Sequence, residues 1–109
     1  MAATLAEKII ARASGQASVR PGDIAVCKVD LAMAHDSSGP RRWRPHLESL
    51  GVGLWDPDKV VIVSDHYVPA VDAESAAILK LTRDFVRDYG VKHFSDMKGI
   101  CHAVMPEMG

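Results

Sequence analysis

The sequence predicts an α/β fold, a three-layer, sandwich-like unit in which helices cover a short parallel or mixed sheet. Two observations support this prediction. Short apolar runs that are typical of buried strands alternate along the chain with segments that have the periodicity of amphipathic helices. The chain has 109 residues, 48% of them hydrophobic, which is enough for the core of one small domain. We therefore expect residues 1–109 to form a single α/β unit.

The first expected element is a helix that begins after Thr4. Glu7 follows three residues later, the spacing of a capping box, in which each side chain accepts a hydrogen bond from the backbone N–H of the other residue. Gly15 suits the end of this helix, because glycine readily adopts the left-handed conformation needed there. The sequence TLAEKIIARASG is thus expected to be helical.

Two apolar runs are expected to form strands that are buried on both faces. Residues 23–30, DIAVCKVD, follow the turn RPGD, and residues 60–63, VVIV, follow an Asp-Pro-Asp turn. Between them, residues 37–55 are rich in proline, glycine and arginine. This composition is typical of a surface loop, with a short helix only at the sequence HLESLG.

The last two expected elements are a helix over residues 72–90 and a strand over residues 91–96. Asp72 is placed to cap the helix and Gly90 to end it. Apolar residues with helical spacing line one of its faces: Ile78, Leu81, Phe85 and Tyr89. The sequence VKHFSD then predicts the third strand of a sheet on which the helices pack.

Charge and apolar content argue against several partners. The 13 basic and 14 acidic residues are mixed along the chain, so we expect no nucleic-acid partner, and the basic cluster RRWR is more typical of a solvated turn. No segment approaches the roughly 20 apolar residues of a membrane span and the N-terminus lacks a cleavable signal, so we expect no membrane and a cytoplasmic location. Cys27 and Cys101 have no metal-binding or disulfide spacing and are expected to be free.

Acidic residues end each of the three predicted strands: Asp30, Asp65 and Asp96. Ligands of open α/β sheets bind beyond the carboxyl ends of the strands, where the connecting loops diverge. His66 follows Asp65 directly, and His102 comes shortly after the third strand. A carboxylate beside an imidazole fixes its tautomer and favours its charged form, which suits proton transfer near neutral pH. The pattern therefore indicates acid–base chemistry.

Two other interpretations of these residues are open. An acid at a strand end is often only a turn former or a helix cap, and a single histidine is often an ordinary surface or core residue. A divalent metal ion is the second possibility, with nitrogen and oxygen ligands from His35, Asp36, His66 and His102. No His-x-x-x-His spacing supports such a site, and we predict no metal bound by this chain.

Three motifs in order, VDLAMAHD, SDHYVPA and KGICHAVMPEMG, resemble the N-terminal part of the 3-isopropylmalate dehydratase large subunits, within the aconitase family. The likeness extends over nearly all of the chain. It implies a fold like the N-terminal part of aconitase and a hydro-lyase reaction. In that reaction, water is removed from a small hydroxy di- or tricarboxylic acid, such as 3-isopropylmalate, and added back at the neighbouring carbon.

The resemblance also implies roles for individual residues. Asp65 and His66 correspond to the family's pair that protonates the departing hydroxyl group, and His102, in the motif GICH, to a further catalytic histidine. Asp30 corresponds to a substrate-pocket position. Ala103 and Tyr67 depart from the residues common at their positions, which puts the choice of substrate in doubt but not the chemistry.

The family's cofactor is a 4Fe-4S cluster that acts as a Lewis acid on the substrate. Its cysteine ligands do not match Cys27 or Cys101, so we expect them outside this chain. The implied partners are the remainder of the large subunit and a separate small subunit. We therefore expect an N-terminal fragment of a longer large subunit, inactive alone. The alternative is a stand-alone α/β module for binding or assembly, without catalysis.

Overall fold

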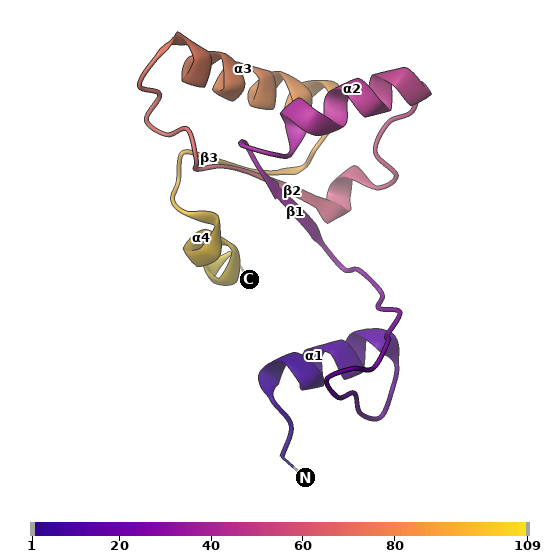
Figure 1. The fold of residues 1–109 in the computed structure, drawn as a ribbon. Coiled ribbons are helices and arrows are strands. Elements are labelled where there is room, and N and C mark those ends of the chain that lie inside the picture. Colours follow the sequence, from indigo (N-terminus) through magenta and orange to yellow (C-terminus); the bar gives the residue numbers. More distant parts are fainter. Residues whose placement is uncertain (1, 109) are drawn as a thin grey trace. The chain divides into compact units, whose positions relative to one another are not determined.

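A computed structural model describes residues 2–108. The chain divides between Asp30 and Leu31 into two compact units. The first holds one helix and extended chain, and the second holds a sheet with helices on it (Figure 1). The predicted α/β fold class is confirmed. That residues 1–109 form a single unit stays a prediction.

The first unit is built on α1 (Leu5–Ser14), which confirms the predicted helix. Both hydrogen bonds of the capping box are present: Glu7 N–H donates to Thr4 Oγ1 (3.2 Å) and Thr4 N–H donates to Glu7 Oε2 (2.7 Å). Gly15 ends the helix with a φ of 70°, a conformation that disfavours residues with a Cβ. Local sequence signals therefore account for both ends of α1.

The strand predicted over residues 23–30 is wrong. Residues 23–30 do not form a strand, and the side chains of Ile24 and Val26 are 94% and 88% exposed. The strand of this region is β1 (Ala32–His35), the next segment along the chain. An apolar run becomes a strand only where another strand offers backbone partners, and β2 pairs with residues 32–35 instead.

The second unit contains, within residues 31–108, a parallel sheet of three strands in the order β1-β2-β3. The strands β2 (Val60–Ser64) and β3 (His93–Asp96) confirm the strands predicted over residues 60–63 and 91–96. The helices α2 (Pro40–Leu50) and α3 (Ala73–Asp88) cover one face of the sheet, and α4 (Cys101–Glu107) lies on the other (Figure 1). These are the three predicted layers.

Every residue of β2 is buried, and its side chains alternate between two cores. Val60 and Ile62 join Phe85 of α3 in the larger core, against which Trp43 and Leu47 of α2 also pack. On the opposite face, the smaller core consists of Val61, Val63 and Cys101, with Met105 packed against it. The predicted burial of this strand on both faces is therefore confirmed.

The helix α2 corrects the prediction of a surface loop with a short helix in residues 37–55. It begins at Pro40, a position that tolerates proline because the missing N–H would have no partner inside the helix. Trp43 and Leu47, one turn apart, anchor it to the larger core. Gly39 precedes it, and a Cβ there would lie 2.7 Å from the Ala34 Cβ, so only glycine lets this turn approach β1 closely.

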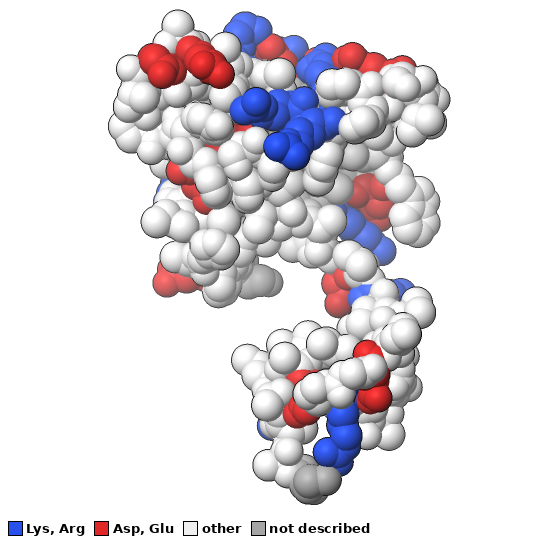
Figure 2. Space-filling model, in the orientation of Figure 1, with Lys and Arg blue, Asp and Glu red and all other residues white. Residues whose placement is uncertain are grey.

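The helix α3 confirms the predicted helix, and Asp72 caps it through its Oδ1, which accepts the Ser75 N–H (2.7 Å). The short helix α4 was not predicted. Charges of both signs are interspersed on the face shown in Figure 2. Within residues 2–108, no helix is long and apolar enough to cross a membrane.

Phe85→Ala should lower the free energy of unfolding by about 3–5 kcal/mol. Phe85 is fully buried and stacks on Tyr89 with ring centroids 4.4 Å apart, so its removal leaves a cavity in the larger core. Urea unfolding followed by circular dichroism measures the loss. Trp55→Ala is the control, because Trp55 is 98% exposed and its loss should change stability by less than about 0.5 kcal/mol. Equal effects of the two changes would contradict the assignment of Phe85 to the core.

The chain should self-associate at high concentration, because apolar side chains stand exposed along residues 24–29. Sedimentation velocity over a concentration series measures this. The double change Ile24→Lys and Val26→Lys should shift the chain towards monomer. The control Val71→Lys, at a residue 85% exposed outside this segment, should not. A chain that is strictly monomeric at high concentration would refute the prediction.

Candidate active site

The carboxyl ends of the three parallel strands meet at one edge of the sheet, and an acid stands at each. Asp36 follows β1, Asp65 follows β2, and Asp96 is the last residue of β3. The histidines His35 and His66 lie beside the first two of these acids. Residues distant in the sequence are thus brought to the edge where open α/β sheets bind ligands.

Asp65 and His66 form the predicted pair. The distance between His66 Nδ1 and Asp65 Oδ1 is 2.6 Å. An ionised carboxylate can only accept a hydrogen bond, so Nδ1 carries the proton and Nε2 is left to accept or deliver another. The Asp65 side chain is 2% exposed and that of His66 44%. The arrangement is a buried carboxylate that orients an imidazole accessible to solvent.

Asp65 stays ionised although it is buried. Burial raises its pKa, but the hydrogen bonds from His66 and from the backbone N–H of Cys101 together lower it below its ordinary value. The Cys101 N–H donates to Asp65 Oδ2 at 2.8 Å, where α4 begins. Burial, together with the hydrogen bond and charge of Asp65, raises the pKa of the Cys101 thiol, which disfavours the reactive thiolate.

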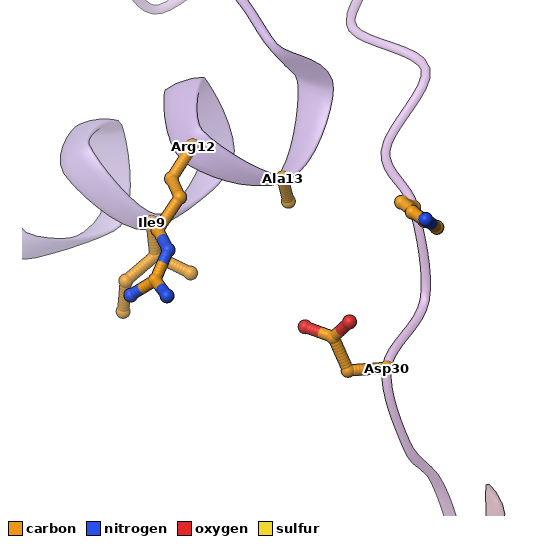
Figure 3. Close-up of a pocket in the computed structure, with 5 residues that line it drawn as sticks. Ile9, Arg12, Ala13 and Asp30 are labelled. Atoms are coloured by element: carbon orange, nitrogen blue, oxygen red, sulfur yellow. The ribbon is translucent and has the colours of Figure 1, made fainter.

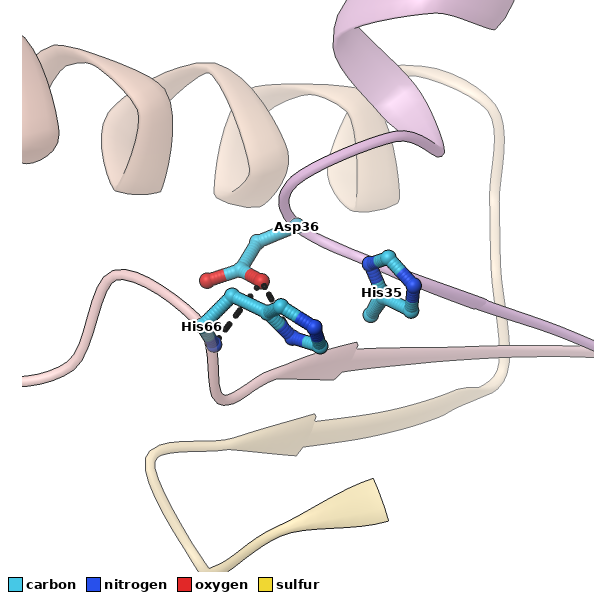
Figure 4. A group of neighbouring side chains, drawn as sticks. All are labelled: His35, Asp36 and His66. Atoms are coloured by element: carbon cyan, nitrogen blue, oxygen red, sulfur yellow. Dashed lines mark hydrogen bonds and ion pairs between the residues drawn. The ribbon is translucent and has the colours of Figure 1, made fainter. Parts of the chain in front are cut away.

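Asp36 is fully buried and supports the turn that carries His66 (Figure 4). Its Oδ1 accepts the backbone N–H of His66 and its Oδ2 that of Tyr67, both at 3.1 Å. The His35 ring stacks on the His66 ring with centroids 4.0 Å apart. From the sequence, Asp36 is expected among the polar residues after the first strand and as a possible metal ligand, whereas Asp30 is expected as the acid that ends this strand, because the strand is predicted one segment too early.

His35, Asp36 and His66 have possible metal-ligand atoms within 4.8 Å of one another. Most of these atoms already have other partners. His66 Nδ1 is bound to Asp65, His35 Nδ1 lies 2.7 Å from Ser37 Oγ, and both Asp36 oxygens accept backbone N–H groups. The two imidazole planes are also nearly parallel, at 19°, so their in-plane lone pairs do not converge on one ion. The geometry fits a hydrogen-bonded cluster better than a metal centre.

The other predicted residues lie in different surroundings. His102 is exposed in the first turn of α4, directly after the residue whose N–H binds Asp65. Asp96 forms an ion pair with Arg83 of α3 (2.8 Å), which gives it a structural partner. Asp30 belongs to the first unit, where its carboxylate lines a pocket near α1 together with Arg12 and Lys28 (Figure 3).

The cysteines of this chain do not fit an iron–sulfur cluster. The sequence contains only Cys27 and Cys101, whereas such clusters are usually held by several thiolates. Cys27 is exposed in the first unit, and Cys101 is buried in the second with a raised pKa. Carboxylates and imidazoles are therefore the groups that this site offers for chemistry.

Comparison with known proteins identifies relatives of the whole chain, although no family model matches it. The 3-isopropylmalate dehydratase large subunit 1 of Methanopyrus kandleri is 47% identical over 100% of this chain and 26% of its own length. That of Aquifex aeolicus is 40% identical with the same coverage. A probable methanogen homoaconitase large subunit of Methanothermobacter thermautotrophicus is 41% identical over 96% of this chain.

The chain spans about a quarter of the length of these relatives. The aligned region includes the helix α1, the sheet and the residues at its carboxyl edge, because these matches cover 100% of this chain. The chain thus belongs to the family of the 3-isopropylmalate dehydratase large subunits and matches their N-terminal quarter.

Proposed function

We propose that this chain is the N-terminal part of a hydro-lyase large subunit. The enzyme would remove water from a hydroxy di- or tricarboxylic acid such as 3-isopropylmalate, a reaction of leucine biosynthesis, and add it back at the neighbouring carbon. The observation that carries the proposal is the 2.6 Å contact between Asp65 and His66 at the edge of the sheet. The identity to dehydratase large subunits supports the same reaction class.

Dehydration needs a proton source, because hydroxide is a poor leaving group. His66, with Nδ1 bound to Asp65, would deliver a proton from Nε2 to the departing hydroxyl group and take one back on rehydration. The ionised Asp65 carboxylate stabilises the imidazolium form and fixes the orientation of the ring. His102 would serve as a second catalytic histidine and Asp30 as a substrate contact, roles that rest on the family resemblance.

The remaining machinery of the enzyme would come from other chain segments. We propose that the ligands of a 4Fe-4S cluster lie in the remainder of the large subunit, since the cysteines of this chain do not fit one. The relatives are named large subunits, which supports a separate small subunit as the second partner. The two free cysteines are typical of a reducing compartment and favour the cytoplasm.

His66→Ala should lower kcat by about 100- to 10,000-fold and change KM much less, because the proton is delivered in the transition state. The assay uses a chimaera in which this chain replaces the N-terminal quarter of the Methanopyrus kandleri large subunit, assembled with its small subunit. Asp65→Asn should act in the same direction, since an amide accepts the ring N–H but does not stabilise imidazolium.

The matched control for His66→Ala is His46→Ala, at an exposed histidine of α2. It should leave kcat within a factor of about two of the unmodified chimaera, as expected of a surface change away from the site. Cluster content is measured in every variant, so that loss of iron is not mistaken for loss of the proton donor. Near-normal turnover of the His66→Ala chimaera would overturn the catalytic assignment.

The 109-residue chain alone should remain nearly free of iron after anaerobic reconstitution with iron and sulfide, because it offers two thiols in separate units. Iron and sulfide analysis with the visible absorbance spectrum measures this. The double variant Cys27→Ser and Cys101→Ser is the control, and its iron content after reconstitution should be as low as that of the unmodified chain. Stoichiometric iron and sulfide in the unmodified chain would refute the expectation.

A further inference from the structure

We propose that Asp36 is a positioning residue that holds the imidazole of His66 against Asp65. Its importance for turnover rests on the proposed function, but its effect on the ring is a property of the chain alone. Asp36 is fully buried, with 0% exposure, so it does not touch solvent. It would therefore act through the peptide that carries His66 and not by contact with substrate.

The geometry of the turn after β2 carries this inference. The backbone of Asp36 is held against β2, because the Asp36 N–H donates a hydrogen bond to the Val63 carbonyl (3.0 Å). Its two oxygens then accept two consecutive backbone N–H groups, of His66 and Tyr67, one at each oxygen. Two hydrogen bonds to adjacent peptides fix both the position and the direction of the turn. The Cα of His66 is thereby held in place.

The imidazole itself is held from three directions. Asp65 Oδ1 binds Nδ1 at 2.6 Å, Asp36 Oδ1 lies 3.7 Å from the same nitrogen, and the His35 ring stacks on one face at 4.0 Å. His35 is fixed in turn by Ser37 Oγ. A rotation of the peptide at residue 66 would break the contacts to Asp65 and His35 together, so the position of the ring depends on the turn.

Only a carboxylate can support this turn fully. An asparagine at position 36 offers one acceptor oxygen and one NH₂ donor, so one of the two backbone N–H groups would face another donor. The substitution preserves size and removes one of the two hydrogen bonds. The Asp36→Asn change therefore tests whether Asp36 acts by accepting both N–H groups or only by filling space in the core.

The test uses nitrogen NMR of the histidine side chains in the 109-residue chain. In the unmodified chain, His66 should show the Nδ1-protonated tautomer set by Asp65. Asp36→Asn should shift it towards the tautomer mixture of a free histidine, as Asp65→Ala also should, because that change removes the acceptor of the Nδ1 proton. The matched control is Asp96→Asn, the same change at a neighbouring strand end, where the partner is Arg83; it should leave the His66 signal unchanged.

A folded Asp36→Asn chain whose His66 signal matches that of the unmodified chain overturns the proposal. Amide hydrogen exchange of the unmodified chain gives a second test that needs no variant. The amides of His66 and Tyr67 should exchange more slowly than those of the exposed neighbours Ala70 and Val71. Equal exchange rates also overturn the proposal.

Activity separates this inference from the proposed function. In an active chimaera, Asp36→Asn should lower kcat by on the order of 100-fold, the size of effect expected from a small misplacement of a reacting group. An inactive unmodified chimaera would argue against the hydro-lyase assignment and leave the NMR result standing. An active chimaera with an unchanged His66 signal in Asp36→Asn would refute the role of Asp36 alone.

Discussion

The burial of β2 on both faces is the constraint on which the second unit depends. A strand with apolar side chains on both sides needs a layer of helices on each face, which α3 and α2 supply on one side and α4 on the other. The strand is short, so its end lies close to both layers. Asp65 comes directly after it, where the core ends and solvent begins.

The same constraint explains the chemistry available at this edge. Two carboxylates, Asp36 and Asp65, are buried at this edge. Within residues 2–108, neither of them is hydrogen-bonded to an arginine or a lysine. Their partners are backbone N–H groups and the imidazole of His66. Backbone donors stabilise the ionised form without neutralising it. The negative charge therefore remains available to favour an imidazolium. This is the electrostatic arrangement that a proton donor near neutral pH requires.

The sequence predicted the elements whose signals are local. The helix α1 has its capping box, α3 its cap at Asp72, and β2 its uninterrupted aliphatic run, and all three form where they were expected. The pair of Asp65 and His66 was also found, because the two residues are adjacent in the sequence. Signals that lie within a few residues of each other can thus be read without knowledge of the fold.

The features that were missed depend on partners distant in the sequence. Ile24 lies in a run as apolar as a strand, but the choice between it and β1 is made by pairing with β2. The start of α4 is stabilised by a carboxylate 36 positions earlier. Asp36 supports peptides 30 and 31 positions later. Periodicity and composition carry no information on such contacts.

The two hydrogen bonds of Asp65 have a consequence for the response of the fold to acid. One carboxylate binds both the first peptide of α4 and the ring of His66, so a single protonation weakens both contacts. The pKa of Asp65 is lower in the folded chain than in the unfolded one, so its contribution to stability is fully present above the unfolded pKa and is lost as the pH falls through the folded pKa. The docking of α4 and the orientation of His66 are thereby thermodynamically linked through one titrating group.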